Sequence, residues 1–348
     1  MMKLLIYVIG DQQHGMGHVM RCLVLAEELE RRGVSVIFVT PPDTPGKRRL
    51  QQAGARVYDF HEADLSWCYR FSDYHAALLD VENGPTFEAL GAMRRYFNHV
   101  ITVNGSGYTF QNIYAVICLS DLIIYQSILS ERDDKVMTLG GADYLMVNPD
   151  YAKCQPDFNG PIVISMGGGD PHRLTWKAAN AIGDLYRLMI VIQGGATQGN
   201  HDTMMLTQGD VINITAPSSL APYINGASLL VGAFGMTSYE AAAAGVPSLL
   251  TGWSEDHVKT ARELEARGIC FSLGLWNQFD GGLLREMTAA LLSERESWQK
   301  MSAAGKALID GRGAARVADE IIKLIERGTT DHGTPTIALD RGADSVRD

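Results

Sequence analysis

Short apolar runs alternate with helical periodicity along the first half of the chain. The residues from Leu4 to Ile9 form an apolar run of strand length, and apolar positions between Val19 and Leu29 recur at helical spacing. This pattern predicts a buried strand followed by a helix over about His18–Arg32, which ends at Gly33. By the same reasoning we expect strands at Val34–Thr40, Arg56–Phe60, His75–Asp80, His99–Asn104 and Leu122–Tyr125, and helices at Lys47–Ala53 and Thr86–Tyr96.

The second half repeats this alternation after a segment of different composition. Prolines and turn residues without periodicity mark Val147–Gly160 as a linker. An apolar run at Pro161–Met166 then predicts a buried strand, and Asp256–Arg267 has the pattern of an amphipathic helix. The other expected elements are strands at Arg187–Gln193, Val211–Thr215, Leu229–Gly232 and Pro247–Leu250, and helices at Arg173–Asp184, at Ser238–Ala244 and between Leu283 and Glu326.

Alternation of strands and helices predicts a parallel, doubly wound sheet in each half, and therefore an α/β fold class. A chain of 348 residues is long enough for two such domains. We expect the first domain at residues 1–147, the linker at 148–160 and the second domain at 161–328. The polar stretch 329–348 lacks periodicity, so we expect it to be a flexible tail.

Charge and cysteine content exclude several classes of protein. A formal net charge of −10 argues against a general nucleic-acid binder, which would carry a basic surface. The 5 cysteines are scattered and form no CxxC pair, which is typical of a reducing compartment, so we expect a cytoplasmic protein without disulfides. No apolar stretch approaches the ~20 residues of a membrane-spanning helix.

Candidate chemistry gathers where the first strand ends. Gly15 and Gly17 lie between this strand and the helix, where a tight turn and close backbone approach favour glycine. The helix N-terminus offers free N–H groups and a partial positive charge to an anion. His18 and Arg21 project from the same face of its first turn, and Asp80 ends another strand at the same edge of the sheet. His18 is therefore a candidate acid or base, although it could also bond only to the backbone.

Two glycine-containing turns in the second half are candidates for the nucleotide site. Gly167, Gly168 and Gly169 follow a buried strand and would let the backbone approach a ligand, whereas a helix cap would need only Asp170. The turn at Gly235, Met236 and Thr237 begins a helix whose N–H groups could face a diphosphate. Glu240, one turn later, could accept hydrogen bonds from ribose hydroxyls, and His257 begins a helix that could reach the same phosphates. Each of these residues has the plain alternative of starting a helix.

Other nucleotide and hydrolase motifs do not fit the sequence. The third glycine of a dinucleotide-binding motif would fall at Met20, and Gly167–Gly169 is not followed by the lysine of a P-loop. A GxSxG nucleophile motif is missing, and no cluster of His or Cys has the spacing of metal ligands. We therefore expect neither a serine hydrolase nor a metal site.

Three segments together resemble a known family. Gly15–Ala26, Ile164–Thr175 and Gly235–Pro247 look like motifs of the UDP-sugar hydrolase of the pseudaminic acid pathway and the SpsG family of spore-coat polysaccharide proteins. The resemblance implies a GT-B fold, in which two Rossmann-like domains face each other across a cleft. It also implies that the nucleotide lies mainly on the second domain and the sugar near the first-domain loop. In the hydrolase, the histidine that matches His18 activates a water molecule, with no metal required.

The chain departs from the family pattern at sites that contact substrate. A Gly-Gly pair before Ser or Thr is common where Phe234-Gly235-Met236-Thr237 stands, and an Asn-Gln pair is common where Asp256-His257 stands. A tyrosine often occupies the position of Glu82. The resemblance therefore does not identify the sugar.

The expected function is hydrolysis of a UDP-linked sugar or amino sugar at its anomeric carbon, in the biosynthesis of a surface polysaccharide or a nonulosonic-acid-type sugar. His18, as general base, Arg21 and Asp80 are the expected catalytic residues. Glycosyl transfer from the same donor to a sugar or polysaccharide acceptor is the alternative, and nucleotide-sugar binding without catalysis is a third. No cofactor besides the nucleotide-sugar is expected.

Overall fold

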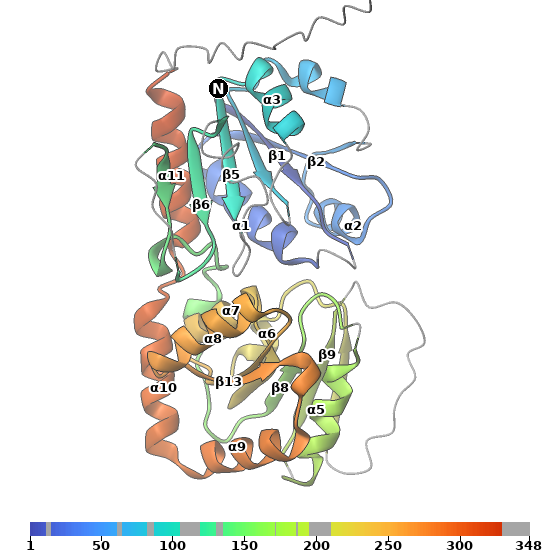
Figure 1. Ribbon diagram of the computed structural model, residues 1–348, viewed down its shortest axis with the longest axis vertical. Helices are drawn as coiled ribbons and strands as arrows, with labels where there is room; N and C mark the ends of the chain where they lie inside the picture. Colours follow the sequence, from blue (N-terminus) through green and yellow to red (C-terminus); the bar gives the residue numbers. More distant parts are fainter. Residues whose placement is uncertain are drawn as a thin grey trace, which may run out of the picture.

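The structure is a computed structural model. It shows two α/β domains stacked along the long axis of the molecule (Figure 1). The predicted tail at 329–348 lies outside the described residues, as does Glu82. The structure describes residues 1–11, 15–60, 65–81, 87–104, 119–129, 135–170, 172–185, 187–194 and 210–328.

The first domain is built on a parallel sheet of 7 strands in the order β3-β2-β1-β4-β5-β6-β7. One of its inner strands, β1 (Lys3–Val8), has apolar side chains on both faces. Leu4, Ile6 and Val8 pack into the core on one face, and the alternate positions Leu5 and Tyr7 pack into the core on the other. The other elements are β2 (Ser35–Thr40), β3 (Val57–Asp59), β4 (Ala76–Asp80), β5 (His99–Asn104), β6 (Leu122–Tyr125), β7 (Met137–Leu139), the helices α1 (Gly17–Arg31), α2 (Pro45–Gln52) and α3 (Phe87–Tyr96), and the 3-10 helix η1 (Leu65–Phe71).

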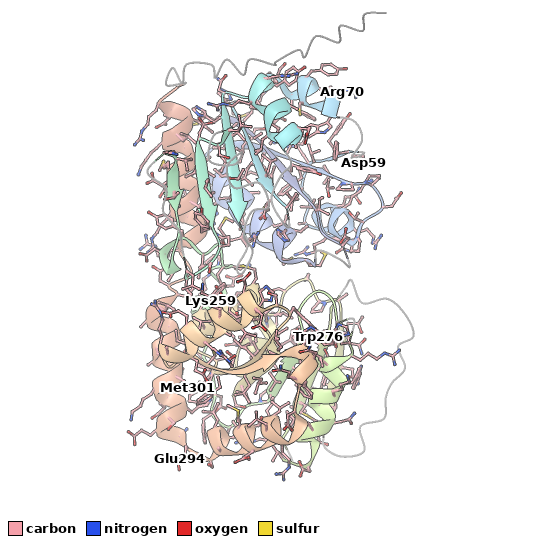
Figure 2. The ribbon with its side chains drawn as sticks, in the orientation of Figure 1. Asp59, Arg70, Lys259, Trp276, Glu294 and Met301 are labelled. Atoms are coloured by element: carbon pink, nitrogen blue, oxygen red, sulfur yellow. The ribbon has the colours of Figure 1, made fainter. Side chains whose placement is uncertain are left out.

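The second domain is a parallel sheet of 6 strands in the order β10-β9-β8-β11-β12-β13. Helices and side chains cover both of its faces (Figures 1 and 2), as expected for a doubly wound sheet. Its elements are β8 (Ile162–Ser165), α5 (Leu174–Ile182), η4 (Gly183–Leu185), β9 (Met189–Gln193), β10 (Val211–Thr215), α6 (Ala221–Ile224), β11 (Leu229–Ala233), α7 (Met236–Ala244), β12 (Ser248–Gly252), α8 (Glu255–Ala266), β13 (Cys270–Leu275), η5 (Trp276–Gln278), α9 (Gly281–Ser293) and α10 (Arg295–Leu308).

The segment that connects the two sheets is ordered and partly buried. It contains two 3-10 helices, η2 (Ala142–Tyr144) and η3 (Tyr151–Lys153). Tyr151 and Cys154, within the predicted linker at 148–160, belong to the hydrophobic core of the second domain. The linker therefore contributes side chains to the second domain instead of acting only as a spacer.

The last described helix, α11 (Gly313–Glu326), returns to the first domain. Val317, Ala318 and Ile321 lie on one face of α11 and are buried in the same core as Leu4 and Cys22. Figure 1 shows α11 (red) beside the sheet of the first domain, while α10 lies beside the second. The predicted second domain, 161–328, includes residues 313–326, whereas the apolar face of this helix packs on the first domain. No helix within the described ranges is both long enough and apolar enough to cross a bilayer.

Candidate functional site

A cavity opens between the two domains at the carboxyl ends of their strands, where ligands bind in doubly wound sheets. We call it the cleft cavity. From the first domain it is lined by the start of α1 and one side of α2, and from the second by loops after β8, β9, β10 and β11. The residues used below are Met16, Gly17, Met20, Pro45, Arg48, Arg49, Gln52, Tyr151, Gly167, Gly168, Ser218, Ser219, Met236, Thr237 and Glu240.

The three predicted catalytic side chains meet in one buried cluster beside this cavity. Asp80 ends β4, which pairs with β1, so the carboxylate lies next to the start of α1. His18 Nδ1 lies 2.7 Å from Asp80 Oδ1, and Arg21 Nε donates to Asp80 Oδ2 at 2.6 Å. The exposed fractions of His18, Arg21 and Asp80 are 6%, 4% and 0%. The cluster is thus an ion pair almost fully removed from solvent.

The charge state of Asp80 is set by its two partners. Burial raises the pKa of this carboxyl, but the charge of Arg21, the charge of His18 and their hydrogen bonds together hold that pKa well below its usual value. The Cys22 thiol donates to Asp80 Oδ2 at 3.2 Å, and burial together with the Asp80 charge raises the pKa of this thiol. Asp80 is therefore ionised and Cys22 neutral at neutral pH.

This geometry determines which nitrogen of His18 is available for chemistry. His18 Nδ1 lies within hydrogen-bonding distance of two groups, the Asp80 carboxylate, which accepts, and Arg21 Nη2 at 3.0 Å, which donates. Both contacts engage Nδ1, so Nε2 is the ring nitrogen that lies outside this cluster of contacts. Gly17 lines the cleft cavity, whereas the His18 side chain is only 8% exposed and is not one of the lining residues. His18 therefore lies next to the lining residue Gly17, and its buried side chain contacts Asp80 within the first domain.

The glycine loops of the two domains touch each other. A Cβ on Gly168 would lie 2.9 Å from the backbone nitrogen of Met16, and a Cβ on Gly17 would lie 3.5 Å from Met236 Cγ. Gly167 and Gly15 have φ values of +86° and +72°, which favour glycine. The close approach predicted for Gly168 is therefore made with the first domain, although Gly167 and Gly168 also line the cavity.

Asp170 and His257, both in the second domain, contact parts of the protein other than the residues that line the cavity. Asp170 accepts hydrogen bonds from the backbone nitrogens of Leu174 and Thr175, both at 2.8 Å, and so caps the start of α5. His257 is buried with its ring 5.5 Å from that of Phe234, at the start of α8. Gly169, Gly235 and His257 are not among the residues that line the cleft cavity in the described part of the chain.

The start of α7 faces the cavity. Met236, Thr237 and Glu240 all line it. The Ser238 hydroxyl donates to the carbonyl of Gly235 at 2.5 Å and fixes the first turn of the helix. The N-terminal N–H groups of α7 therefore lie at the cavity wall, where they can interact with an anion.

Glu240 is held by a tyrosine from the linker. The Tyr151 hydroxyl is hydrogen-bonded to the Glu240 carboxyl and to Ser219. Burial raises the pKa of Glu240 to about 7, and the hydrogen bond from Tyr151 offsets this only in part. Burial and the Glu240 charge also raise the pKa of Tyr151, so the phenol stays neutral. A ligand that donates hydrogen bonds to Glu240 would favour its ionised form.

Arg48, Arg49 and Tyr151 are among the lining side chains that the sequence pattern did not identify. Arg48 and Arg49 belong to a run of basic residues that is typical of a solvated helix face, and Tyr151 belongs to a segment without periodicity. In the structure, Arg49 Nη2 donates to the carbonyl of Ser218 in the other domain at 3.0 Å. The signal available in the sequence was the spacing of Pro45, Arg48, Arg49 and Gln52, which places them on one side of a helix.

Comparison with known proteins places this geometry in context. No known protein-family profile matches the chain. The chain is 24% identical over 352 residues to the spore coat polysaccharide biosynthesis protein SpsG of Bacillus subtilis (strain 168), with 92% of this chain and 98% of that protein covered. This relative is of the kind that the sequence motifs resemble.

Solved structures match almost the whole chain. Acinetobacter baumannii MurG superposes with a TM-score of 0.66 at 14% identity, covering 93% of this chain and 100% of MurG. The spinosyn forosaminyltransferase SpnP gives 0.69 at 13% identity, covering 93% and 99%. This chain has the GT-B fold. Anabaena HepE in complex with UDP-glucose gives 0.62 at 13% identity, covering 93% and 100%.

The GT-B fold confirms the predicted fold class, with two parallel-sheet domains facing across a cleft. In this GT-B chain the cavity is lined by both domains, so a ligand within it would contact the glycine loop of α1 and the start of α7 together. Gly17, which precedes His18, and Met236, Thr237 and Glu240 of α7 thus border one space.

Proposed function

We propose that this protein is an enzyme that acts on a nucleotide-linked sugar in the biosynthesis of a polysaccharide. One observation carries the proposal: the start of α7 with Glu240 and the loop that precedes His18 line the same cavity from opposite domains. The similarity to SpsG, a protein of polysaccharide biosynthesis, and to HepE, which binds UDP-glucose, supports this reading. The substrate is proposed to be UDP-linked.

In the proposed complex the nucleotide lies on the second domain. The N–H groups at the start of α7 would face the diphosphate, with Met236 and Thr237 beside it. Glu240 would accept hydrogen bonds from the ribose hydroxyls. The sugar would then extend toward Gly15, Gly17 and the His18 cluster on the first domain.

The proposed reaction is hydrolysis at the anomeric carbon. A water oxygen bonds to this carbon, and the water gives a proton to Nε2 of His18. The bond from carbon to the phosphate oxygen breaks, and its electron pair leaves with the nucleoside diphosphate. Asp80 stabilises the imidazolium that forms, and the N–H groups of α7 take up the developing charge of the leaving group. The products are a free sugar and a nucleoside diphosphate.

Transfer to an acceptor hydroxyl is the second candidate. The similarity of the whole chain to SpnP, named as a forosaminyltransferase, favours it. In that reaction the acceptor oxygen takes the place of the water oxygen, and the same proton passes to His18. The proposed donor site is identical in the two reactions.

Turnover of a panel of UDP-, GDP- and CDP-sugars tests the proposal. We expect release of a nucleoside diphosphate from at least one donor. Free sugar formed without any added acceptor identifies the hydrolase, and a strict requirement for an acceptor identifies the transferase. Binding of a nucleoside diphosphate without turnover of any donor, with or without acceptors, would contradict an enzymatic role.

A further inference from the structure

One side of α2 forms the first-domain wall of the cleft cavity. Pro45, Arg48, Arg49 and Gln52 all line it, at helical positions that share one face. Opposite them lie Ser218 and Ser219 with the neighbouring residues of the loop after β10. Two arginines and a glutamine amide therefore project into a space whose facing loop carries no acidic residue.

The helix is held in place at its start. The Thr44 hydroxyl oxygen accepts a hydrogen bond from the Lys47 backbone nitrogen at 3.1 Å, and Pro45 begins the helix. Gly46 N donates to the carbonyl of Gly10 at 2.8 Å, and a Cβ on Gly46 would lie 2.7 Å from that oxygen. Since Gly10 follows β1, the arginines are positioned by the same strand end that carries the His18 loop.

Arg48 and Arg49 have no carboxylate partner within the described part of the chain. Arg49 donates from Nη2 to the carbonyl of Ser218, and its buried Nε makes no hydrogen bond to any described residue. Arg48 donates only a long hydrogen bond, 3.3 Å, to the carbonyl of Asp43. Lys47, which is not a lining residue, is paired with Asp59 at 2.8 Å. The unpaired cations of α2 are thus the ones that face the cavity.

The charge of the cavity contrasts with that of the whole chain. The chain has a formal net charge of −10, whereas Glu240, hydrogen-bonded to Tyr151, is the one carboxyl group among the described residues that line the cleft cavity. A guanidinium N–H that is removed from water without a partner is unfavourable, and an anionic oxygen removes that cost. The arrangement therefore suits a ligand with negatively charged oxygens.

We propose that α2 supplies a first-domain part of the nucleotide site, in which Arg49, assisted by Arg48, binds the phosphate-bearing part of the nucleotide. This inference rests on the proposed function for the identity of the ligand. Because Arg49 also bonds to Ser218 of the second domain, the nucleotide would be held between both domains and not by the second alone.

Calorimetric titration of the full-length protein with UDP, UMP and uridine tests this inference. Wild type is compared with Arg49→Gln and Arg48→Gln. Lys47→Gln is the matched control, because it removes the same charge from the same helix outside the lining. We expect Arg49→Gln to weaken UDP binding about 10-fold to 100-fold, the range for a charged hydrogen bond, and Arg48→Gln to weaken it less. Uridine binding, measured by competition, and the Lys47→Gln variant should change less than about twofold.

The outcomes separate this inference from the proposed function. If wild type binds no nucleoside diphosphate, the proposed function fails first. If wild type binds UDP and both arginine variants bind it equally well, the role of α2 is wrong while the proposed function stands. An equal loss of uridine and UDP would overturn the assignment to the phosphates. Arg48 is exposed, so its variant remains informative if Arg49→Gln does not fold.

Discussion

At the scale of single residues, the centre of the site is a carboxylate with several buried partners. Asp80 accepts hydrogen bonds from His18, Arg21 and Cys22 and is itself fully buried. The sequence places Asp80 at the carboxyl end of a strand, the same end of the sheet as the loop before His18. It does not show that β4 lies next to β1, because strand order depends on how the helices pack across the sheet. That adjacency brings Asp80 to α1.

Asp80→Asn tests how much this ion pair contributes to stability. The change leaves the Arg21 charge buried without a counter-charge, so we expect the free energy of unfolding to fall by about 3–5 kcal/mol. Urea unfolding measures the loss, with hydrogen exchange of the β1 amides reporting on the first domain. Asp59→Asn is the control: its partner Lys47 is also in the first domain, but Figure 2 shows Asp59 at the outer edge, and loss of such an exposed pair costs ~0–1 kcal/mol.

Because the Asp80 ion pair requires an ionised carboxylate, we expect the stability that it contributes to depend on pH. The folded-state pKa of Asp80 is lowered, so its stabilisation is fully present above the unfolded pKa of about 3.9 and is lost as the pH falls toward the folded value. The difference in stability between wild type and Asp80→Asn should therefore shrink below about pH 4. A difference that stays constant from pH 7 to pH 3 would show that the ion pair is not its cause.

We expect nucleotide binding to depend on pH as well, because the Glu240 carboxyl lines the cavity and has a raised pKa. Its pKa in the free protein is raised to about 7, so at pH 6 the carboxyl is mostly protonated. If ribose hydroxyls donate to the carboxylate, binding releases this proton, and UDP affinity should rise about tenfold from pH 6 to pH 8. Tyr151, which also lines the cavity, stays neutral in this range because burial raises the pKa of its phenol.

Titration of UDP against wild type and Glu240→Gln across this pH range measures the effect. In Glu240→Gln, any change of UDP affinity with pH comes from groups other than Glu240, including the nucleotide's own phosphates. The difference between the affinity curves of wild type and variant therefore measures the contribution of Glu240. Parallel curves for wild type and variant would mean that Glu240 does not accept hydrogen bonds from the ligand.

At the scale of elements, the pattern of apolar residues predicts the inner strands and two of the four edge strands, β3 and β10. The strands β1, β4 and β8 are continuous apolar runs, because each is buried on both faces of a parallel sheet. The other two edge strands, β7 and β13, have no counterpart among the predicted strands. Most residues of β13 are only half buried, and its alternation is correspondingly weak.

The position of α11 cannot be predicted from periodicity alone. Its amphipathic pattern shows that one face must be buried, but either domain could bury it. Ile321 is fully buried in the core of the first domain. Ile321→Ala should therefore destabilise the first domain by about 2–5 kcal/mol. Faster hydrogen exchange in β1 and α1, with β11 unchanged, is the expected result.

Leu264→Ala is the matched control for that prediction. Leu264 is as fully buried as Ile321 but belongs to the core of the second domain, so its loss should accelerate exchange in β11 and leave β1 unchanged. If Ile321→Ala accelerated exchange only in the second domain, the packing of α11 described here would be wrong.

At the scale of the whole molecule, two sheets of the same architecture place their strand ends against one space. The sequence predicts both domains and each glycine loop, because these are local patterns. It does not reveal that Gly168 packs on Met16 or that Arg49 reaches Ser218, because contacts between domains depend on their relative orientation. The catalytic candidates on the first domain and Glu240 on the second become one site only through that orientation.

The rate of nucleoside diphosphate release by His18→Ala tests the central claim most directly, with UDP binding measured in parallel. We expect a loss of ~10²–10⁴-fold in kcat, as for removal of a general base, with little change in UDP affinity. His75→Ala is the control. His75 precedes β4 at the amino ends of the strands, away from the cleft cavity, and its Nδ1 accepts a hydrogen bond from Lys3 N. Release by His18→Ala at the wild-type rate would contradict the proposed reaction.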